Sequence, residues 1–205
     1  MMAENKNLIY AVLTNCCSTD VCRPVLGSPF AKGGNVYASD GRICVRYAGV
    51  EGVAPDATAD HKNLPESIDG FLEIDSDAVP MDDLSAYGID LASYLSMADV
   101  LKYSDKAPDD EGYTSFDDDV DIFALVKVGG KYFRAAYLRR ITDALSLLGE
   151  MSPTFYMKKD MMIVRAGRVR FGVMAVRDVP DDSPDHAIVD AATGEFVHHL
   201  SSWMA

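Results

Sequence analysis

Carboxylates crowd together at one point of the chain, in Asp117-Asp118-Asp119-Val120-Asp121. Carboxylate oxygens suit Ca²⁺ and Mg²⁺, but this run lacks the glycine and the distal glutamate of a calcium-binding helix–loop–helix motif. Near the C-terminus, His198 and His199 lie close to Trp203. Adjacent residues on a strand point to opposite faces, which argues against one metal site that uses both histidines. We therefore expect a non-catalytic protein with no metal and no cofactor, and a small metal-dependent enzyme is the least favoured alternative.

The four cysteines, Cys16, Cys17, Cys22 and Cys44, are further candidates for metal binding or nucleophilic chemistry. Zinc sites commonly use paired Cys-x-x-Cys spacings, which are missing here, and no histidine lies near the first three cysteines in sequence. The adjacent pair is awkward to cross-link, and a chain of this length does not need disulfides. We expect reduced thiols, with zinc binding as the alternative. Cys44 has no identifiable base, which argues against a nucleophile.

Length and charge limit the class of protein. The chain has 205 residues, 48% of them hydrophobic, which is enough for one large domain or two small ones. Its net charge of −13 argues against a generally basic nucleic-acid binder. The charge is uneven, because residues 134–177 hold nine Arg or Lys against three Asp or Glu. No apolar run approaches the roughly 18 residues of a membrane-spanning helix, and we expect a cytoplasmic protein that does not bind membranes.

One order of elements occurs twice along the chain. A predicted helix is followed by strands that turn through a tight hairpin, Ser39-Asp40-Gly41-Arg42 in the first copy and Arg165-Ala166-Gly167-Arg168 in the second. Helices are predicted from apolar residues at helical spacing, and strands from alternation. The first copy comprises a helix over 4–17 and strands over 25–31, 35–39 and 42–47; the second comprises a helix over 135–148 and strands over 154–158, 161–165 and 168–176.

These elements indicate an α+β fold, a domain of two pseudo-repeated helix-plus-strand halves with an inserted acidic segment and a C-terminal β-hairpin. The inserted segment contains a predicted strand over 71–74 and a predicted helix over 91–103. The hairpin pairs 187–190 with 195–200. The predicted boundaries are 1–50 for the first half, 51–120 for the insertion, 121–177 for the second half and 178–205 for the C-terminal extension.

Short stretches in both halves carry a resemblance to a known family. In the first half they are Arg23–Gly27 and Val36–Ile43, with Ser39 in place of the threonine of an Ala-Thr-Asp-Gly turn. In the second half they are Tyr132–Leu138, before and into a helix, and the closing strands Val164–Arg177. Together these stretches resemble one domain of the bacterial DNA sliding clamp, the processivity subunit of the replicative polymerase. The resemblance implies a processivity-like role in DNA replication, although that clamp has three such domains per subunit and closes a ring as a dimer.

The resemblance also implies where DNA would bind. The two helices would face duplex DNA and contact its phosphates without reading its bases. The candidate DNA-binding residues are Lys6 on the first helix, with Arg139 and Arg140 on the second, all off the apolar stripes. The competing interpretation is that they are ordinary solvated residues of amphipathic helices. Expected partners are duplex DNA, replication or other DNA-handling proteins, and a second copy of the chain if it forms an oligomer.

Charge supports two further alternatives. The net charge of −13 favours an acidic protein-interaction module that mimics DNA, although the basic second half opposes it. Several arginines also recur on the predicted strands and hairpin ends, where they either contact nucleic acid or pair with the acidic insertion. Pairing is the simpler interpretation, though exposed ion pairs add little stability. These arginines are Arg42, Arg46, Arg165, Arg168 and Arg170.

Overall fold

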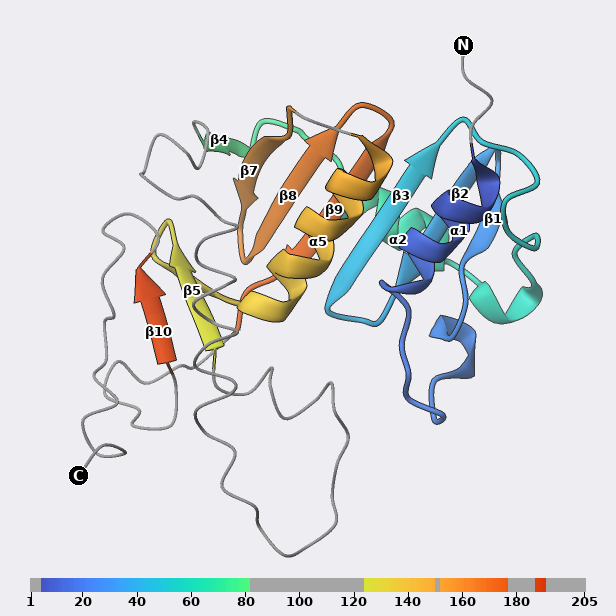
Figure 1. The fold of residues 1–205 in the computed structure, drawn as a ribbon, viewed down its shortest axis with the longest axis horizontal. Coiled ribbons are helices and arrows are strands. Elements are labelled where there is room, and N and C mark those ends of the chain that lie inside the picture. The colour runs from blue at the N-terminus through green and yellow to red at the C-terminus, as the bar shows by residue number, and fades with distance from the viewer. Residues whose placement is uncertain (1–4, 82–123, 150–151, 177–186, 191–205) are drawn as a thin grey trace, which may run out of the picture. The chain divides into compact units, whose positions relative to one another are not determined.

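The computed structural model describes residues 5–81, 124–149, 152–176 and 187–190. These residues fall into two compact units, one drawn from 1–81 and 140–174 and the other from 82–139 and 175–205. We call them unit 1 and unit 2. The described residues form helices and mostly antiparallel sheets (Figure 1), which confirms the α+β fold class.

Unit 1 is built around one seven-stranded sheet in which every neighbouring pair of strands is antiparallel. The strand order is β1-β2-β3-β9-β8-β7-β4, so the N-terminal and C-terminal parts of the chain meet where β3 pairs with β9. The strands are β1 (Phe30–Lys32), β2 (Asn35–Ser39), β3 (Ile43–Ala48), β4 (Val79–Met81), β7 (Thr154–Lys158), β8 (Met161–Ala166) and β9 (Val169–Met174).

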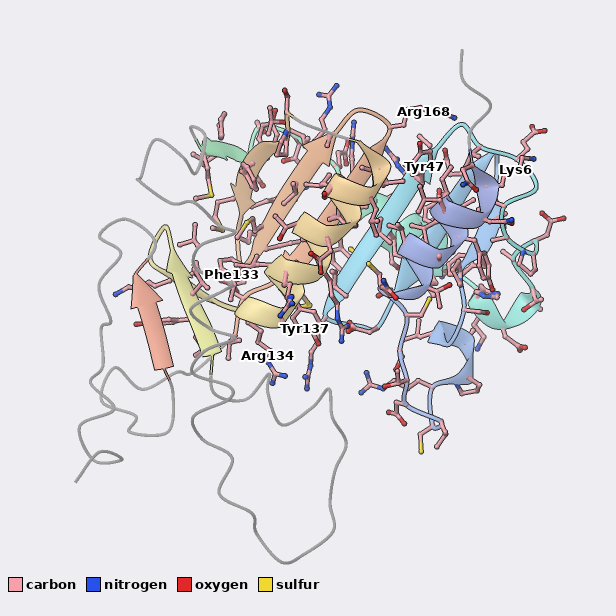
Figure 2. The ribbon with its side chains drawn as sticks, in the orientation of Figure 1. Lys6, Tyr47, Phe133, Arg134, Tyr137 and Arg168 are labelled. Atoms are coloured by element: carbon pink, nitrogen blue, oxygen red, sulfur yellow. The ribbon has the colours of Figure 1, made fainter. Side chains whose placement is uncertain are left out.

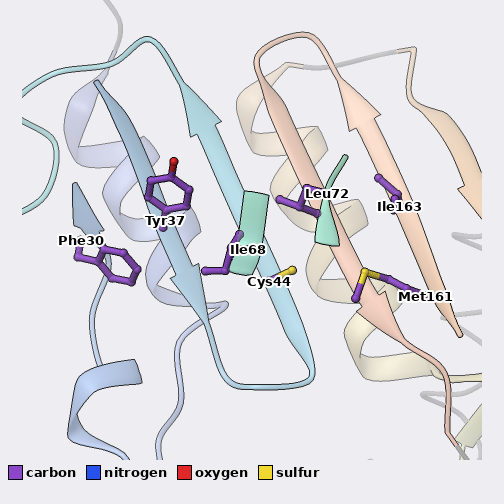
Figure 3. Close-up of a cluster of buried hydrophobic side chains, with 7 residues drawn as sticks. All are labelled: Phe30, Tyr37, Cys44, Ile68, Leu72, Met161 and Ile163. Atoms are coloured by element: carbon purple, nitrogen blue, oxygen red, sulfur yellow. The ribbon is translucent and has the colours of Figure 1, made fainter. Parts of the chain in front are cut away.

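Helices lie on both faces of this sheet (Figures 1 and 3). On one face are α1 (Lys6–Thr14) and the part of α5 (Ala135–Leu148) that belongs to unit 1. On the other face is α2 (Leu64–Phe71). The Asn5 side chain caps α1 by accepting a hydrogen bond from the Leu8 amide at 3.2 Å. Two short 3-10 helices, Pro24–Leu26 and Ala59–His61, also belong to this unit.

Each face of the sheet contributes its own part of the core. Toward α1 and α5, Val45 of β3 and Phe171 of β9 lie directly opposite each other, and both are fully buried. Toward α2, the helix residues Ile68 and Leu72 pack on side chains of four strands (Figure 3). This second cluster includes Phe30, Tyr37, Cys44, Met161 and Ile163. Both layers remove apolar surface from water, which is the main force that holds helices on a sheet.

Unit 2 contains a second sheet with the strand order β10-β5-β6. β5 (Ala124–Val128) and β6 (Lys131–Arg134) form an antiparallel hairpin, and β10 (Ala187–Asp190) pairs with β5 in parallel. β10 is the first strand of the predicted C-terminal hairpin, whose second strand at 195–200 lies outside the described residues.

Two predicted strands are wrong. Within 25–31, Val25 and Leu26 belong to the 3-10 helix that follows Arg23, and the extended backbone begins only at Phe30. Within 71–74, Phe71 ends α2 and Leu72 caps it. Part of the predicted insertion therefore builds unit 1, because α2 covers the sheet and β4 forms its edge. The predicted helix over 91–103 lies outside the described residues.

Candidate nucleic-acid interface

Lys6 lies in the first turn of α1, and its ammonium group is held within the chain. Its Nζ donates a hydrogen bond to the backbone carbonyl of Glu51, in the loop that follows β3. The side chain is otherwise exposed. An ammonium has three N–H donors, so one bond to a carbonyl leaves its charge uncompensated and two donors able to reach another acceptor.

Arg140 joins α5 to the β2–β3 hairpin. Its Nη1 lies 3.4 Å from Oδ2 of Asp40, and the Arg140 and Asp40 side chains are 26% and 12% exposed. The other carboxylate oxygen of Asp40 accepts hydrogen bonds from the amides of Arg42 and Ile43, at 2.7 and 2.8 Å. Asp40 thus shapes its own turn and also binds the helix of the second half, which is a structural role for Arg140 within unit 1.

Arg139 precedes this residue on α5 and is exposed. Lys6, Arg139 and Arg140 are all of the basic side chains in α1 and α5, and Asp143 is the one carboxylate of these helices. The structure therefore places two of the three predicted residues, Lys6 and Arg140, in one unit, while Arg139 belongs to unit 2. It shows intramolecular contacts for both residues in unit 1.

The thiols are placed for packing. Cys16, Cys17 and Cys44 are buried, and this burial raises the pKa of each thiol to about 12. A thiolate is the form that attacks or binds metal, so these three groups are held in the unreactive form. Among the residues that the structure describes, no group of three or more His, Cys, Asp or Glu could hold a metal ion. His198, His199 and the Asp117–Asp121 run lie outside those residues.

Arg168, in the β8–β9 hairpin, binds the end of β3. Its Nε donates to the carbonyl of Ala48 at 2.8 Å, and its Nη2 donates to the carbonyl of Gly49. The guanidinium carbon lies 5.4 Å from the centre of the Tyr47 ring (Figure 2), a cation–π distance. Together with the Ala48 amide, which donates to the Arg168 carbonyl, these contacts join the two hairpin halves of the sheet.

Three other arginines come together on the α2 face, and we call them the arginine row. Arg46 of β3 lies opposite Arg170 of β9, which in turn lies opposite Arg165 of β8. Directly opposed residues share a face of the sheet, so the three side chains emerge in one line across it. The sequence shows each arginine on a strand, but their adjacency depends on pairings that only the structure shows.

Comparisons with models of known protein families, with curated proteins and with solved structures found no match. No helix in the described part of the chain is long and apolar enough to cross a membrane. The resemblance to sliding clamps therefore depends on the short stretches of sequence quoted above, and function has to be inferred from the contacts within the protein.

Proposed function

We propose that this protein is a non-catalytic, clamp-like accessory factor in DNA transactions, built from two copies of one helix-plus-strands unit. The observation that carries the proposal is a constant shift in the strand pairings of unit 1. Ser39 pairs with Cys44, and Arg165 pairs with Arg170. Each residue of the second pair comes 126 positions after the corresponding residue of the first pair.

The same shift relates the outer strands and the centre of the sheet. The Phe30–Tyr37 pair of β1 and β2 corresponds to the Tyr156–Ile163 pair of β7 and β8, again 126 residues later. Val45 and Phe171, which pair where β3 meets β9, are themselves 126 residues apart. A local twofold axis at this pair would superpose the two halves of the sheet, as expected of a duplicated unit.

The helices extend this correspondence. Each half precedes its three strands with a helix, α1 in the first and α5 in the second, and in unit 1 both helices lie on the same face of the sheet (Figure 1). In this proposal Lys6, Arg139 and Arg140 contact phosphates of the duplex. Contacts to phosphates give affinity without sequence specificity, which suits an accessory factor that must act at any sequence.

Duplex binding measured against salt tests the proposal. The full chain should bind a fluorescent duplex at low salt, and each lost phosphate contact should flatten the plot of log K against log salt by about 0.9. Arg139→Ala plus Arg140→Ala should therefore reduce the slope by about two units. The matched control is Lys32→Ala plus Lys62→Ala, which removes the same charge close to α2, where Lys32 pairs with Glu66 and Lys62 ends the 3-10 helix before α2, and which should leave the slope unchanged.

Two outcomes would overturn the proposal. One is the absence of duplex binding at low salt, and the other is an equal loss of slope in the control variant. The molecular mass in solution tests whether the protein can form a ring around DNA, because a monomer of this size cannot encircle a duplex. A dimer or larger ring would support encirclement, whereas a monomeric protein that binds DNA would keep the accessory role without a ring.

A second candidate is the acidic protein-interaction module that mimics DNA. The observation that favours it is the net charge of −13, together with the intramolecular contacts that already use Lys6 and Arg140. Such a module would not bind duplex DNA at low salt and would instead bind a basic DNA-handling protein, with an affinity that falls as salt rises. The two candidates therefore predict opposite results in the same salt series.

A further inference from the structure

The arginine row places three like charges on adjacent strands. Like charges at directly opposed positions destabilise a sheet unless something compensates them. The carboxylate that interacts with the row among the described residues is Asp69 of α2, which accepts from Arg46 Nη1 at 2.8 Å. Its other oxygen accepts from the hydroxyl of Tyr37 at 2.9 Å. In the part of the chain that the structure describes, three guanidinium groups therefore face one carboxylate, an excess of about two positive charges.

The three arginines differ in what already holds them. Arg170 Nη1 donates to the carbonyl of Leu72, at the C-terminal end of α2, over 3.2 Å. Arg46 keeps a buried Nε that has no partner among the described residues. Arg165 is exposed, and its side chain makes no hydrogen bond or ion pair with any residue of the described ranges. Burial and the charges of Arg46 and Arg165 lower the pKa of Arg170.

The row also breaks the proposed repeat. Residues 126 positions away from Arg46, Arg170 and Arg165 are Gly172, Cys44 and Ser39, and these three likewise pair in one line across β9, β3 and β2. That second line is small and uncharged, and a Cβ on Gly172 would lie 2.9 Å from the Leu72 side chain of α2. One half of the α2 face is therefore closed by the helix, whereas the other ends in an exposed arginine.

We infer that the arginine row binds the phosphate group of a phosphate monoester, with Arg165 as the residue that captures it. A guanidinium presents two parallel N–H donors to an oxyanion, and the three oxygens of a terminal phosphate can accept from more than one arginine. A monoester carries about −1.5 to −2 charges at pH 7, which matches the excess positive charge of the row. The diester phosphates of nucleic acid carry one charge each and match it less well.

Calorimetric titration of the full chain, at constant ionic strength, tests this site with methyl phosphate and with inorganic phosphate. Both should bind saturably. Dimethyl phosphate should bind about tenfold more weakly, because it carries one negative charge and has two non-bridging oxygens, whereas the methyl phosphate dianion carries two charges and has three such oxygens. Affinity for methyl phosphate should fall as the pH drops below about 6, where the dianion takes up a proton.

Arg165→Gln should weaken methyl phosphate binding about tenfold, and Arg165→Lys should recover only part of the loss because it lacks the two-pronged donor. Arg165 is exposed, so both variants should keep the unfolding temperature of the parent. The control is Arg42→Gln, an exposed arginine of the other hairpin, which should bind as the parent does. Three results would refute the site: methyl phosphate does not bind saturably, dimethyl phosphate binds with the same affinity as methyl phosphate, or Arg165→Gln and Arg42→Gln have the same affinity for methyl phosphate. The row lies on the face opposite α1, so these results are independent of the duplex assay.

Discussion

Gly172 is the position where the contact between α2 and the sheet is tightest, and Gly172→Ala should destabilise the protein. A Cβ there would lie 2.9 Å from Leu72 Cδ2, 2.9 Å from Met161 Sδ and 3.0 Å from Cys44 Sγ. Extra methyl groups in a close-packed core cost about 1–3 kcal/mol. Replacing glycine in a strand returns about 0.5–1 kcal/mol. Taking the middle of each range, the expected net loss in the free energy of unfolding is about 1 kcal/mol.

The same substitution in α2 supplies a control of opposite sign. Gly70 is helical and has open space where a Cβ would lie, so Gly70→Ala should stabilise the protein by about 0.5–1 kcal/mol. Urea denaturation followed by far-ultraviolet circular dichroism measures both variants. Leu72→Ala alone should also destabilise the protein. The double variant Leu72→Ala plus Gly172→Ala should lose less stability than the sum of the losses of Leu72→Ala and Gly172→Ala, because shortening Leu72 makes room for the new methyl group. A Gly172→Ala protein as stable as the parent, or strictly additive losses, would refute the packing of α2 on β9.

Two further predictions concern the thiols and Arg168. At pH 8 a thiol reagent should react rapidly with Cys22, which is exposed, and with Cys16, Cys17 and Cys44 only on unfolding. Because the pKa values of these three rise from 9.0 to about 12 on folding, their contribution to stability is complete below pH 9 and is lost between pH 9 and 12. A urea midpoint that stays constant over that range would contradict their burial. Arg168→Ala should lower the free energy of unfolding by about 1–2 kcal/mol, because it removes the bonds to the Ala48 and Gly49 carbonyls and the contact with Tyr47. Arg168→Lys should recover only part of this loss, and urea denaturation measures both variants. Equal stability of all three proteins would refute this role.

The elements of the two halves could largely be predicted from local pattern. The helix Ala135–Leu148 occurs with the predicted bounds, because its stripe of Leu138, Ile141 and Leu145 repeats at helical spacing. The strands on either side of the two predicted hairpin turns also occur close to their predicted bounds, although helices cover both faces of the sheet and burial along these strands does not strictly alternate. In the helix, burial and local periodicity agree, and in the strands the turn residues between them are the stronger signal.

The predicted strand over 71–74 is wrong because the sequence there fits both a strand pattern and a helix pattern. Phe71, Leu72 and Ile74 read as a short apolar strand, yet Leu64, Ile68 and Leu72 are four residues apart and form one face of α2. Pro65 would break the interior of a helix, but it lies in the first turn of α2, where proline is favoured. That combination of spacing and proline was the signal in the sequence for α2.

The arginine row could not be predicted in the same way. Arg46 and Arg170 are directly opposed although 124 residues separate them along the chain, and their register is set by the pairing of β3 with β9. The sequence identifies them as arginines on strands, and simple pairing with acidic residues was the expected role. The structure bears this out for Arg46, which pairs with Asp69, and within the described ranges Arg165 has no acidic partner.

The position of α2 decides where long side chains fit on this face of the sheet. Leu72 lies over Gly172, so the line formed by Ser39, Cys44 and Gly172 has no room there for long side chains. The arginines fit in the parallel line on the other side of the Val45–Phe171 pair. The end of α2 also faces that line, where its Leu72 carbonyl accepts from Arg170. A helix C-terminus carries a partial negative charge, which offsets part of the positive charge of Arg170 and Arg46 and leaves Arg165 the least compensated. An anion should therefore bind with modest affinity, and Arg165 should control that affinity more than either of its neighbours.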